Sequence, residues 1–268
     1  MINTLFWNVR GLSKASHFRR LKYLVVTNKL QLLVVCESHV NVSRAEAFRI
    51  RLGFDCVRTH SSGLLWVFFN LPFVGFVATE GDQFLSLEIS HPQLSAPLTV
   101  TAVHAASTGE ERRVLWDGVL HCQPHQRPWI VVGDFNVVVE PWEKRGGRPF
   151  RVAEARDFVD FMASAGLFDG GFSGSNFTWC NNRHSRARIW KRLDRVLLNE
   201  ACMDLHVSVT VDHLGRHPSD HAPLLMAVST RLDSKPRCFR FINAWAAHKD
   251  FLGVVKQSWE QECEGPPL

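Results

Sequence analysis

The chain has 268 residues, and 31 Lys plus Arg against 26 Asp plus Glu give a formal net charge of +5. Hydrophobic residues make up 46% and charged residues 21%, which excludes wholesale disorder, a collagen-like chain and a coiled coil. The longest apolar stretch, 64–77, is interrupted by Asn70 and Pro72 and is too short for a membrane span. The seven cysteines are scattered without CxxC spacing, so neither a disulfide framework nor a zinc site is indicated.

Hydrophobic spacing predicts a mixed order of strands and helices. Apolar runs predict strands over 4–9, 32–36, 64–69, 74–79, 84–89, 98–103, 129–133, 192–198 and 224–228. Apolar residues at helical spacing predict helices over 18–30, 44–52, 110–121 and 152–165. Because strand–strand connections are mixed with strand–helix connections, this order favours a mixed-sheet α/β protein over a doubly wound parallel one.

The composition changes near residue 230. We expect 1–230 to form one domain, and 231–268 to form an appendage that begins with a linker at 233–237. One amphipathic helix is expected within 239–259, without a core of its own. The final residues, 264–268, look like an arbitrary stop, so the appendage is expected to be the start of a longer segment.

Polar residues stand at the ends of the apolar strands. The set comprises Asn8, Glu37, His104, Asp134, Asn136, Asp194 and the run Ser219-Asp220-His221. Because strand ends converge on one rim of a sheet, these groups are expected to meet in one cleft. Oxygen-rich side chains of this kind fit Mg²⁺ or Mn²⁺ and not zinc. Each motif alone is more typical of a turn or loop, but the conjunction of all of them in one chain points to a catalytic site.

Several of these segments carry a family resemblance. They are Trp7-Asn8-Val9-Arg10-Gly11-Leu12, Cys36-Glu37-Ser38-His39, Gly133-Asp134-Phe135-Asn136, Arg192-Leu193-Asp194-Arg195 and Ser219-Asp220-His221. Together they resemble the exonuclease–endonuclease–phosphatase superfamily. Two further segments, 177–182 and 239–245, are similar to the apurinic-type endonuclease domain of plant LINE (non-LTR) retrotransposons and to its connector toward a reverse transcriptase domain.

The resemblance implies a fold and a reaction. The fold is a DNase I-like four-layer sandwich, in which two mixed β-sheets pack face to face and helices flank them. The reaction is metal-dependent hydrolysis of a phosphodiester, with Mg²⁺ or Mn²⁺ as cofactor and double-stranded DNA as partner. The resemblance also implies contact with element RNA through a downstream domain. The implied function predicts nuclear localisation, or otherwise cytoplasmic, since no clear import signal is found. No membrane association is expected, because no apolar stretch is long enough to span a membrane.

The resemblance also assigns roles residue by residue. Glu37 would hold the metal, with Asn8 and Asp220 close to it. Asp134 would orient or deprotonate the attacking water, and Asn136 would position that water and the phosphate. Asp194 would pair with His221 and keep its imidazole charged against the phosphate. These roles agree with the chemistry, because phosphodiester hydrolysis needs a water, a base and positive charge at the phosphate.

A short basic segment is expected to contact DNA. Residues 183–195 contain six cations and a single acid, and a hairpin in this place reaches into the DNA groove in related endonucleases. We therefore expect DNA contacts from Arg183, Arg186, Arg188, Lys191 and Arg192, and from Thr178 and Ser219 at the phosphates. A basic cluster alone, without the family resemblance, is more typical of a solvated loop.

One position departs from the family pattern. Where these nucleases usually carry Tyr before a small residue, this chain has His104-Ala105. A histidine can also donate to a phosphate oxygen, so His104 is kept among the catalytic candidates. Two alternatives stay open: a catalytically inert retrotransposon remnant that binds nucleic acid, and a hydrolase of the same fold acting on a phospholipid or inositol phosphate.

Overall fold

The computed structural model describes residues 2–124, 126–204, 207–230 and 251–259. By internal contacts the chain divides into two units, 1–232 and 233–268. In the second unit the described part is the helix α7 (Phe251–Trp259), which lies inside the predicted helical range. The predicted linker at 233–237 and the connector motif at 239–245 lie outside the described residues.

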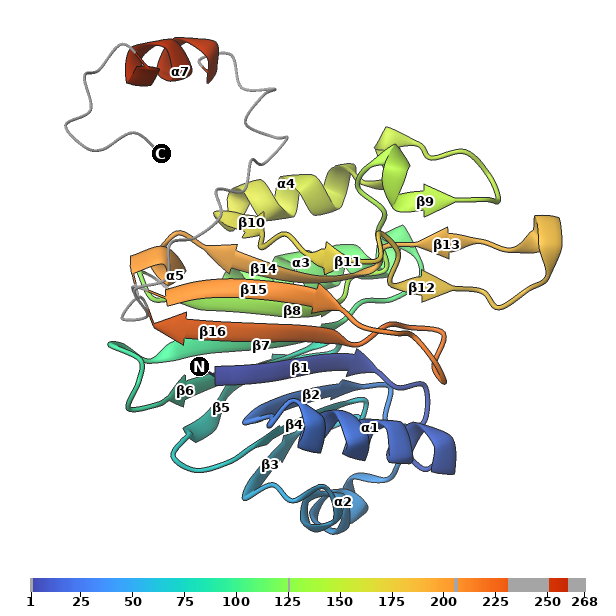
Figure 1. The fold of residues 1–268 in the computed structure, drawn as a ribbon, viewed down its shortest axis with the longest axis vertical. Helices are drawn as coiled ribbons and strands as arrows, with labels where there is room; N and C mark the ends of the chain where they lie inside the picture. Colours follow the sequence, from blue (N-terminus) through green and yellow to red (C-terminus); the bar gives the residue numbers. More distant parts are fainter. Residues whose placement is uncertain (1, 125, 205–206, 231–250, 260–268) are drawn as a thin grey trace. The chain divides into compact units, whose positions relative to one another are not determined.

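The first unit contains two large mixed β-sheets (Figure 1). Sheet 1 has the strand order β11 (Ser173–Gly174), β15 (Val207–His213), β16 (Leu224–Thr230), β1 (Ile2–Asn8), β2 (Leu32–Cys36), β4 (Leu65–Phe69), β3 (Cys56–Thr59). Sheet 2 has the order β10 (Leu167–Asp169), β14 (Asp194–Asn199), β8 (Trp129–Asp134), β7 (Leu98–His104), β6 (Phe84–Ser90), β5 (Val74–Gly81). In the two large sheets, the pairs β1–β2, β7–β8 and β11–β15 are parallel, and the remaining pairs are antiparallel.

Helices cover the outer faces of both sheets, which gives four layers (Figure 1). On sheet 1 lie α1 (Ala15–Thr27) and α2 (Ala45–Leu52), the latter preceded by a 3₁₀ turn, η1 (Val42–Arg44). On sheet 2 lie α3 (Gly109–His121) and α4 (Arg156–Ser164), with η3 (Val152–Glu154) before α4. The short elements η2 (Pro141–Glu143), η4 (Ser185–Ala187) and α5 (Ala201–Asp204) lie in connections. The predicted four-layer sandwich is confirmed.

The alternation of side chains along each strand builds three apolar clusters. In β1, Phe6 points to the cluster between the sheets, whereas Leu5 and Trp7 pack under α1 and α2. The strands are therefore apolar on both faces, which is why the sequence shows continuous apolar runs. On the other side, Trp116 of α3 stacks on Phe161 of α4 at 5.0 Å between ring centroids and closes the cluster below sheet 2.

Most predicted elements are present, with shifted ends. The range 152–165 was predicted as one helix, but it is a 3₁₀ turn followed by α4. The helix predicted over 18–30 begins earlier, at Ala15, and ends at Thr27, because Lys29 takes a left-handed backbone (φ 48°). The strands β3 and β15 and the small sheet of β12 (Trp179–Cys180), β13 (Trp190–Lys191) and β9 (Lys144–Arg145) were not predicted. No described helix is long and apolar enough to cross a membrane.

Candidate active site

Strand ends from both large sheets meet at one edge of the sandwich. In sheet 1, Asn8 at the end of β1 lies beside Cys36 at the end of β2, and Glu37 follows directly. In sheet 2, Asp134 at the end of β8 is paired with His104 of β7 on one side and Asp194 of β14 on the other. The predicted convergence is thereby observed, with side chains contributed by both sheets.

A glycine allows the close approach of β7 and β8 next to Asp134. A Cβ atom at Gly133 would collide with the carbonyl oxygen and Cβ of Val103. Gly133 therefore lets the two parallel strands pack closely just before the catalytic candidate. The backbone then turns sharply, because Asn136 has a left-handed backbone (φ 53°) and donates its N–H to Asp134 Oδ1 at 3.0 Å.

Asn8 links the two halves of the site. Its Nδ2 atom donates to Glu37 Oε1 at 2.8 Å and to Asp134 Oδ2 at 3.1 Å. Its side chain is fully buried, so these hydrogen bonds fix both carboxylates in a site shielded from water. Asn8 therefore holds the carboxylate of sheet 1 against that of sheet 2.

Glu37 is surrounded by hydrogen-bond donors and cations. His39 Nε2 lies 3.1 Å from Glu37 Oε2, His104 Nε2 lies 3.4 Å from Oε1, and Arg10 Nε lies 3.5 Å from Oε2. Burial acts to raise the pKa of Glu37, but hydrogen bonds from His104 and Asn8 and the charge of Arg10 hold this pKa well below its usual range. Glu37 is therefore a carboxylate at neutral pH, although it is buried.

His221 and two aspartates form the other half of the site. His221 Nδ1 donates to Asp194 Oδ2 at 2.9 Å, and His221 Nε2 lies 3.6 Å from Asp134 Oδ2. Burial acts to lower the pKa of His221, but the charges of Asp194 and Asp134 outweigh it and raise this pKa above its ordinary value. The same burial raises the pKa of Asp194. The imidazole is thus oriented by one aspartate and directed at the other.

Asp220 lies at the outer rim of the same site. Its Oδ2 accepts a hydrogen bond from Trp179 Nε1 at 3.1 Å, and its Oδ1 lies 3.5 Å from Arg10 Nε. Arg10 Nε is thus equally distant from Glu37 and Asp220, and one cation already lies between the two carboxylates. The oxygen donors of Glu37, Asp220, Asn8 and Asp134 are of the kind that Mg²⁺ and Mn²⁺ prefer. The residues present therefore fit a divalent cation.

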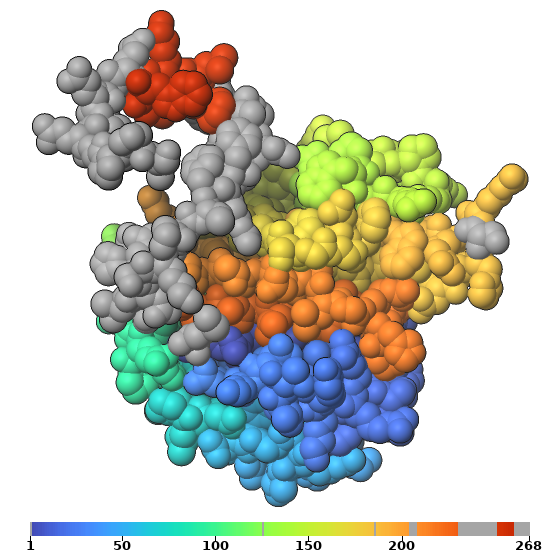
Figure 2. Space-filling model, in the orientation of Figure 1, coloured from blue at the N-terminus to red at the C-terminus, as the bar shows by residue number. Residues whose placement is uncertain are grey.

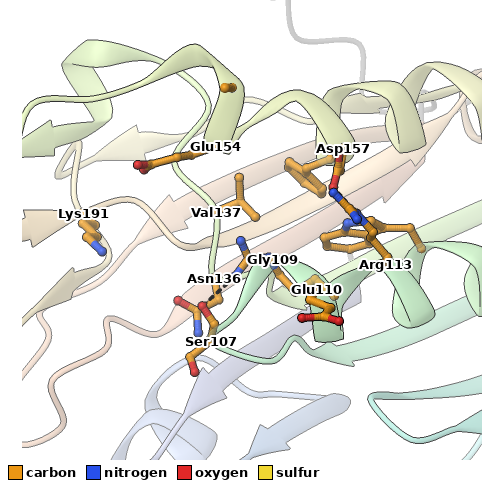
Figure 3. Close-up of a pocket in the computed structure, with 13 residues that line it drawn as sticks. Ser107, Gly109, Glu110, Arg113, Asn136, Val137, Glu154, Asp157 and Lys191 are labelled. Carbon is orange, nitrogen blue, oxygen red and sulfur yellow. Dashed lines mark hydrogen bonds and ion pairs between the residues drawn. The ribbon is translucent and has the colours of Figure 1, made fainter.

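A pocket opens beside Asn136 (Figure 3). It has a volume of about 490 Å³ and is lined mainly by polar and charged side chains, among them Ser107, Arg112, Glu154 and Lys191. An ion pair between Arg113 Nε and Asp157 Oδ2, 2.8 Å apart, joins α3 to α4 at its wall. The predicted DNA contact Lys191 thus lines a pocket that also reaches the catalytic candidate Asn136.

Three of the predicted DNA contacts are buried in the structure. Thr178 is fully buried, and its Oγ1 accepts hydrogen bonds from the backbone N–H groups of Leu193 (2.9 Å) and Asp194 (3.0 Å). Ser219 is also buried, and its Oγ donates to the Asn8 carbonyl at 2.9 Å. Both hydroxyls hold the backbone around catalytic candidates.

Arg192 is the third buried residue of this set. Its guanidinium is 4% exposed and contacts Glu143 Oε1 at 3.0 Å and Asp169 Oδ1 at 2.8 Å. The same carboxylates hold Arg195. Neither Arg192 nor Arg195 lies on the surface, because both form ion pairs in a buried network. In contrast, Arg183, Arg186 and Arg188 are exposed on the segment joining β12 and β13, which projects from the surface (Figures 1 and 2).

His213 lies close to this buried network, and its shifted pKa makes the stability of the fold depend on pH. Its ring stacks on Phe172 at 4.3 Å, and its Nδ1 donates to the Ser175 carbonyl at 2.6 Å. Burial lowers the pKa of His213 to about 4, below the ordinary value of 6.5. Between these values only the unfolded chain binds the proton, so His213 destabilises the fold as the pH falls from about 6.5 toward 4.

The His213→Phe substitution is expected to flatten this dependence. Phenylalanine keeps a ring against Phe172 but does not titrate, so the loss of stability between pH 7 and 5 should be about 2 kcal/mol smaller than in the parent. The check is urea unfolding of both proteins at pH 7 and 5. An equal loss of stability in parent and variant would show that His213 is protonated in the folded protein.

Two residues of the site were not predicted. Arg10 lies within the segment 7–12 that carried the family resemblance, but no role was assigned to it. His39, next to the predicted Glu37, was likewise without a role. Left-handed backbones at Arg10 (φ 48°), Glu37 (φ 52°) and His39 (φ 48°) turn these side chains into one site, and one sequence gives no signal for such turns.

Comparisons with known proteins agree with this architecture. The two packed sheets and the helices outside them define a four-layer α/β sandwich of the DNase I-like type. Residues 5–221 match the endonuclease/exonuclease/phosphatase family, and the chain belongs to this family. No curated protein matches the sequence.

Solved structures of similar fold include a 3′ phosphatase and two endonucleases by their titles. The 3′ phosphatase NExo from Neisseria bound to a product DNA hairpin is 16% identical, with a TM-score of 0.65 over 85% of this chain and 100% of that one. An AP endonuclease from Archaeoglobus fulgidus is 18% identical, with a TM-score of 0.64 over 85% and 99%. The endonuclease domain of TRAS1, a telomere-specific non-LTR retrotransposon, is 14% identical, with a TM-score of 0.62 over 86% and 99%.

Proposed function

We propose that this chain is a divalent-metal-dependent endonuclease that nicks double-stranded DNA. The observation that supports this most strongly is the contact of Asn8 with both Glu37 and Asp134, at 2.8 and 3.1 Å, with His221 beside Asp134. In this arrangement Glu37 would bind the metal, Asp134 would act as the base and His221 would add positive charge. Phosphodiester hydrolysis needs a base for the attacking water and positive charge at the phosphate.

Each side chain has a role in the proposed reaction. Glu37, with Asn8 and Asp220 near it, would hold Mg²⁺ or Mn²⁺, which supplies positive charge at the phosphate when bound. Asp134 would accept the proton of the attacking water, and Asn136 would position that water and a phosphate oxygen. His221, oriented by Asp194, would place a protonated imidazole against the developing charge. His104 would donate to a phosphate oxygen in place of the usual tyrosine.

The proposed DNA interface consists of the exposed arginines of the 181–189 segment together with Lys191. The triple substitution of Arg183, Arg186 and Arg188 by Gln is expected to weaken binding to a DNA duplex without changing the fold. Each arginine that contacts a phosphate contributes about 0.9 to the slope of log affinity against log salt, so the slope should fall by about 2.7. Fluorescence anisotropy over a range of salt concentrations measures this slope.

A matched control is available at the opposite end of the sandwich. Arg127 precedes β8 at the end away from Asp134 and pairs with Glu88 at 2.8 Å. The Arg127→Gln variant should keep the salt slope of the parent. An unchanged slope in the triple variant would remove the 181–189 segment from the DNA interface.

The proposed biological role is that of a LINE endonuclease. The nick would leave a 3′-hydroxyl from which a reverse transcriptase copies element RNA at the target site, and the protein would act in the nucleus. The motifs shared with plant LINE endonucleases support this role, as does the similarity of fold to the TRAS1 endonuclease domain. Binding of element RNA would require a domain outside this chain.

A plasmid nicking assay tests the proposed activity. The parent should convert supercoiled DNA to open circles with Mg²⁺ or Mn²⁺ and not with EDTA, and Glu37→Gln should need far more metal. Absence of nicking by the folded parent with either metal would overturn the proposal. The His104→Tyr variant then separates two causes, since recovered nicking would mean that this one substitution silenced a nuclease.

A further inference from the structure

Arg10 is a charged residue in the site to which neither the resemblance nor the proposed reaction gives a role. It lies in the loop between β1 and α1, two residues after Asn8. The loop is held on both sides of Arg10: its N–H donates to Asn8 Oδ1 at 3.3 Å, and its carbonyl accepts from Lys14 Nζ at 2.8 Å. Its left-handed backbone (φ 48°) turns the side chain toward the strand ends and not along the loop.

The guanidinium of Arg10 lies between two carboxylates that would hold or flank a metal. Arg10 Nε lies 3.5 Å from both Glu37 Oε2 and Asp220 Oδ1, the two carboxylates that would bind or flank the cation. The guanidinium and a divalent ion are both positively charged and would repel each other. A divalent ion bound by these oxygens would therefore compete with Arg10 for them. Metal binding by these oxygens would therefore favour a movement of the Arg10 side chain away from them.

The surroundings of Arg10 allow this movement. Its side chain is 48% exposed, whereas those of Glu37 and Asp220 are 11% and 20% exposed. The long, half-exposed stem can thus move outward without opening the core, while the carboxylates stay fixed. A displaced guanidinium at the rim of the site would meet the DNA phosphates, and its planar donor groups suit two phosphate oxygens at once.

We propose that Arg10 neutralises Glu37 and Asp220 in the metal-free protein, and contacts a DNA phosphate at the site after the metal has displaced it. Arg10 would then be a phosphate-binding catalytic residue that is engaged only in the metal-bound protein. This inference rests on the proposed function for the nature of its substrate. The alternative is an ordinary rim ion pair, which would contribute little to either metal or DNA binding.

The first test is metal binding without DNA. Calorimetric titration of Mg²⁺ into the full chain should show roughly fivefold tighter binding for Arg10→Gln than for the parent, because a competing charge is removed. Arg10→Lys should stay close to the parent. The control Lys22→Gln removes the same charge from the exposed side of α1 and should leave the Mg²⁺ affinity unchanged. Unchanged or weaker Mg²⁺ binding in Arg10→Gln would overturn the proposed competition.

The second test is DNA binding with and without metal. Anisotropy of a labelled DNA duplex should show only a small deficit for Arg10→Gln in EDTA, since Arg10 is then paired with Glu37 and Asp220 and does not contact DNA. With Ca²⁺, the parent should bind roughly tenfold more tightly than Arg10→Gln, since a charge-assisted contact is then made. Equal affinities in Ca²⁺, or the same deficit in EDTA, would overturn the proposed contact with phosphate.

The failure of this inference can be distinguished from failure of the proposed function. If the parent neither binds nor nicks DNA, the endonuclease proposal fails, and the phosphate contact of Arg10 fails with it. The Mg²⁺ titration still decides whether Arg10 competes with a cation. If the parent nicks DNA and Arg10→Gln behaves like the parent in both tests, only the role of Arg10 is wrong.

Discussion

Replacing Asp134 by Asn is expected to reduce the rate of DNA nicking by roughly 10³-fold, the effect of losing a positioned general base. The amide has the size of the carboxylate and can still accept the Asn136 N–H, which lies 3.0 Å from Asp134 Oδ1. It carries no charge, however, and cannot take the proton of the attacking water. Single-turnover nicking of a supercoiled plasmid at saturating Mg²⁺ measures the change.

The fold should survive this substitution. Asp134 is buried beside Asp194, so neutralising it relieves a repulsion between two carboxylates. The substitution also removes the acceptor of Asn8 Nδ2 and the charge that faces His221, so the two effects oppose each other. Thermal unfolding of Asp134→Asn should therefore occur close to the temperature of the parent. Nicking within tenfold of the parent rate would show that another group acts as the base.

Replacing Glu143 by Ala is expected to destabilise the fold by about 3–5 kcal/mol, since it leaves buried cations without their partner. Glu143 is 2% exposed and contacts Arg192 at 3.0 Å and Arg195 at 2.7 Å through Oε1. Burial acts to raise the pKa of Glu143, but Arg195 outweighs it and holds this pKa below its usual range. In the variant, Asp169 alone would face both guanidinium groups. Urea unfolding followed by tryptophan fluorescence gives the free energy of unfolding.

A surface ion pair provides the comparison. Glu88 pairs with Arg127 at 2.8 Å, but the arginine side chain is 56% exposed. Glu88→Ala should cost less than about 1 kcal/mol, because water screens this pair and replaces the lost contact. A similar cost for both variants would mean that water reaches Glu143 and that the network is not buried in solution.

The sequence predicted the site best where buried strands end. The runs before Glu37 and Asp134 are apolar on both faces, so they could only be central strands, and their following polar residues had to lie at a sheet edge. The family resemblance supplied the pairing of Asp194 with His221, which the structure shows at 2.9 Å. The four-layer fold likewise came from the resemblance, because residue periodicity alone indicated only a mixed sheet.

Other features depend on contacts that one sequence does not display. Thr178, Ser219 and Arg192 stand beside predicted site residues, and their polar groups suggested DNA contact. Their partners, such as Asp169 for Arg192, lie far along the chain and are brought near only by the fold. The strand β15, in contrast, alternates Val207, Val209 and Val211 with polar residues, a pattern typical of a strand, and it could have been predicted.

The site is built across the seam between two separate sheets. Asn8, Glu37 and His221 are attached to sheet 1, whereas His104, Asp134 and Asp194 are attached to sheet 2. Hydrogen bonds cross this seam from Asn8 to Asp134 and from His221 to Asp194. The distance between the sheets, over which these bonds form, depends on the apolar layer where Phe6, Val34, Ala102 and Val132 pack. The thickness of this apolar layer therefore controls the distance between the two halves of the active site. Adding or removing a methyl group there would change the rate of the reaction without altering any residue of the site.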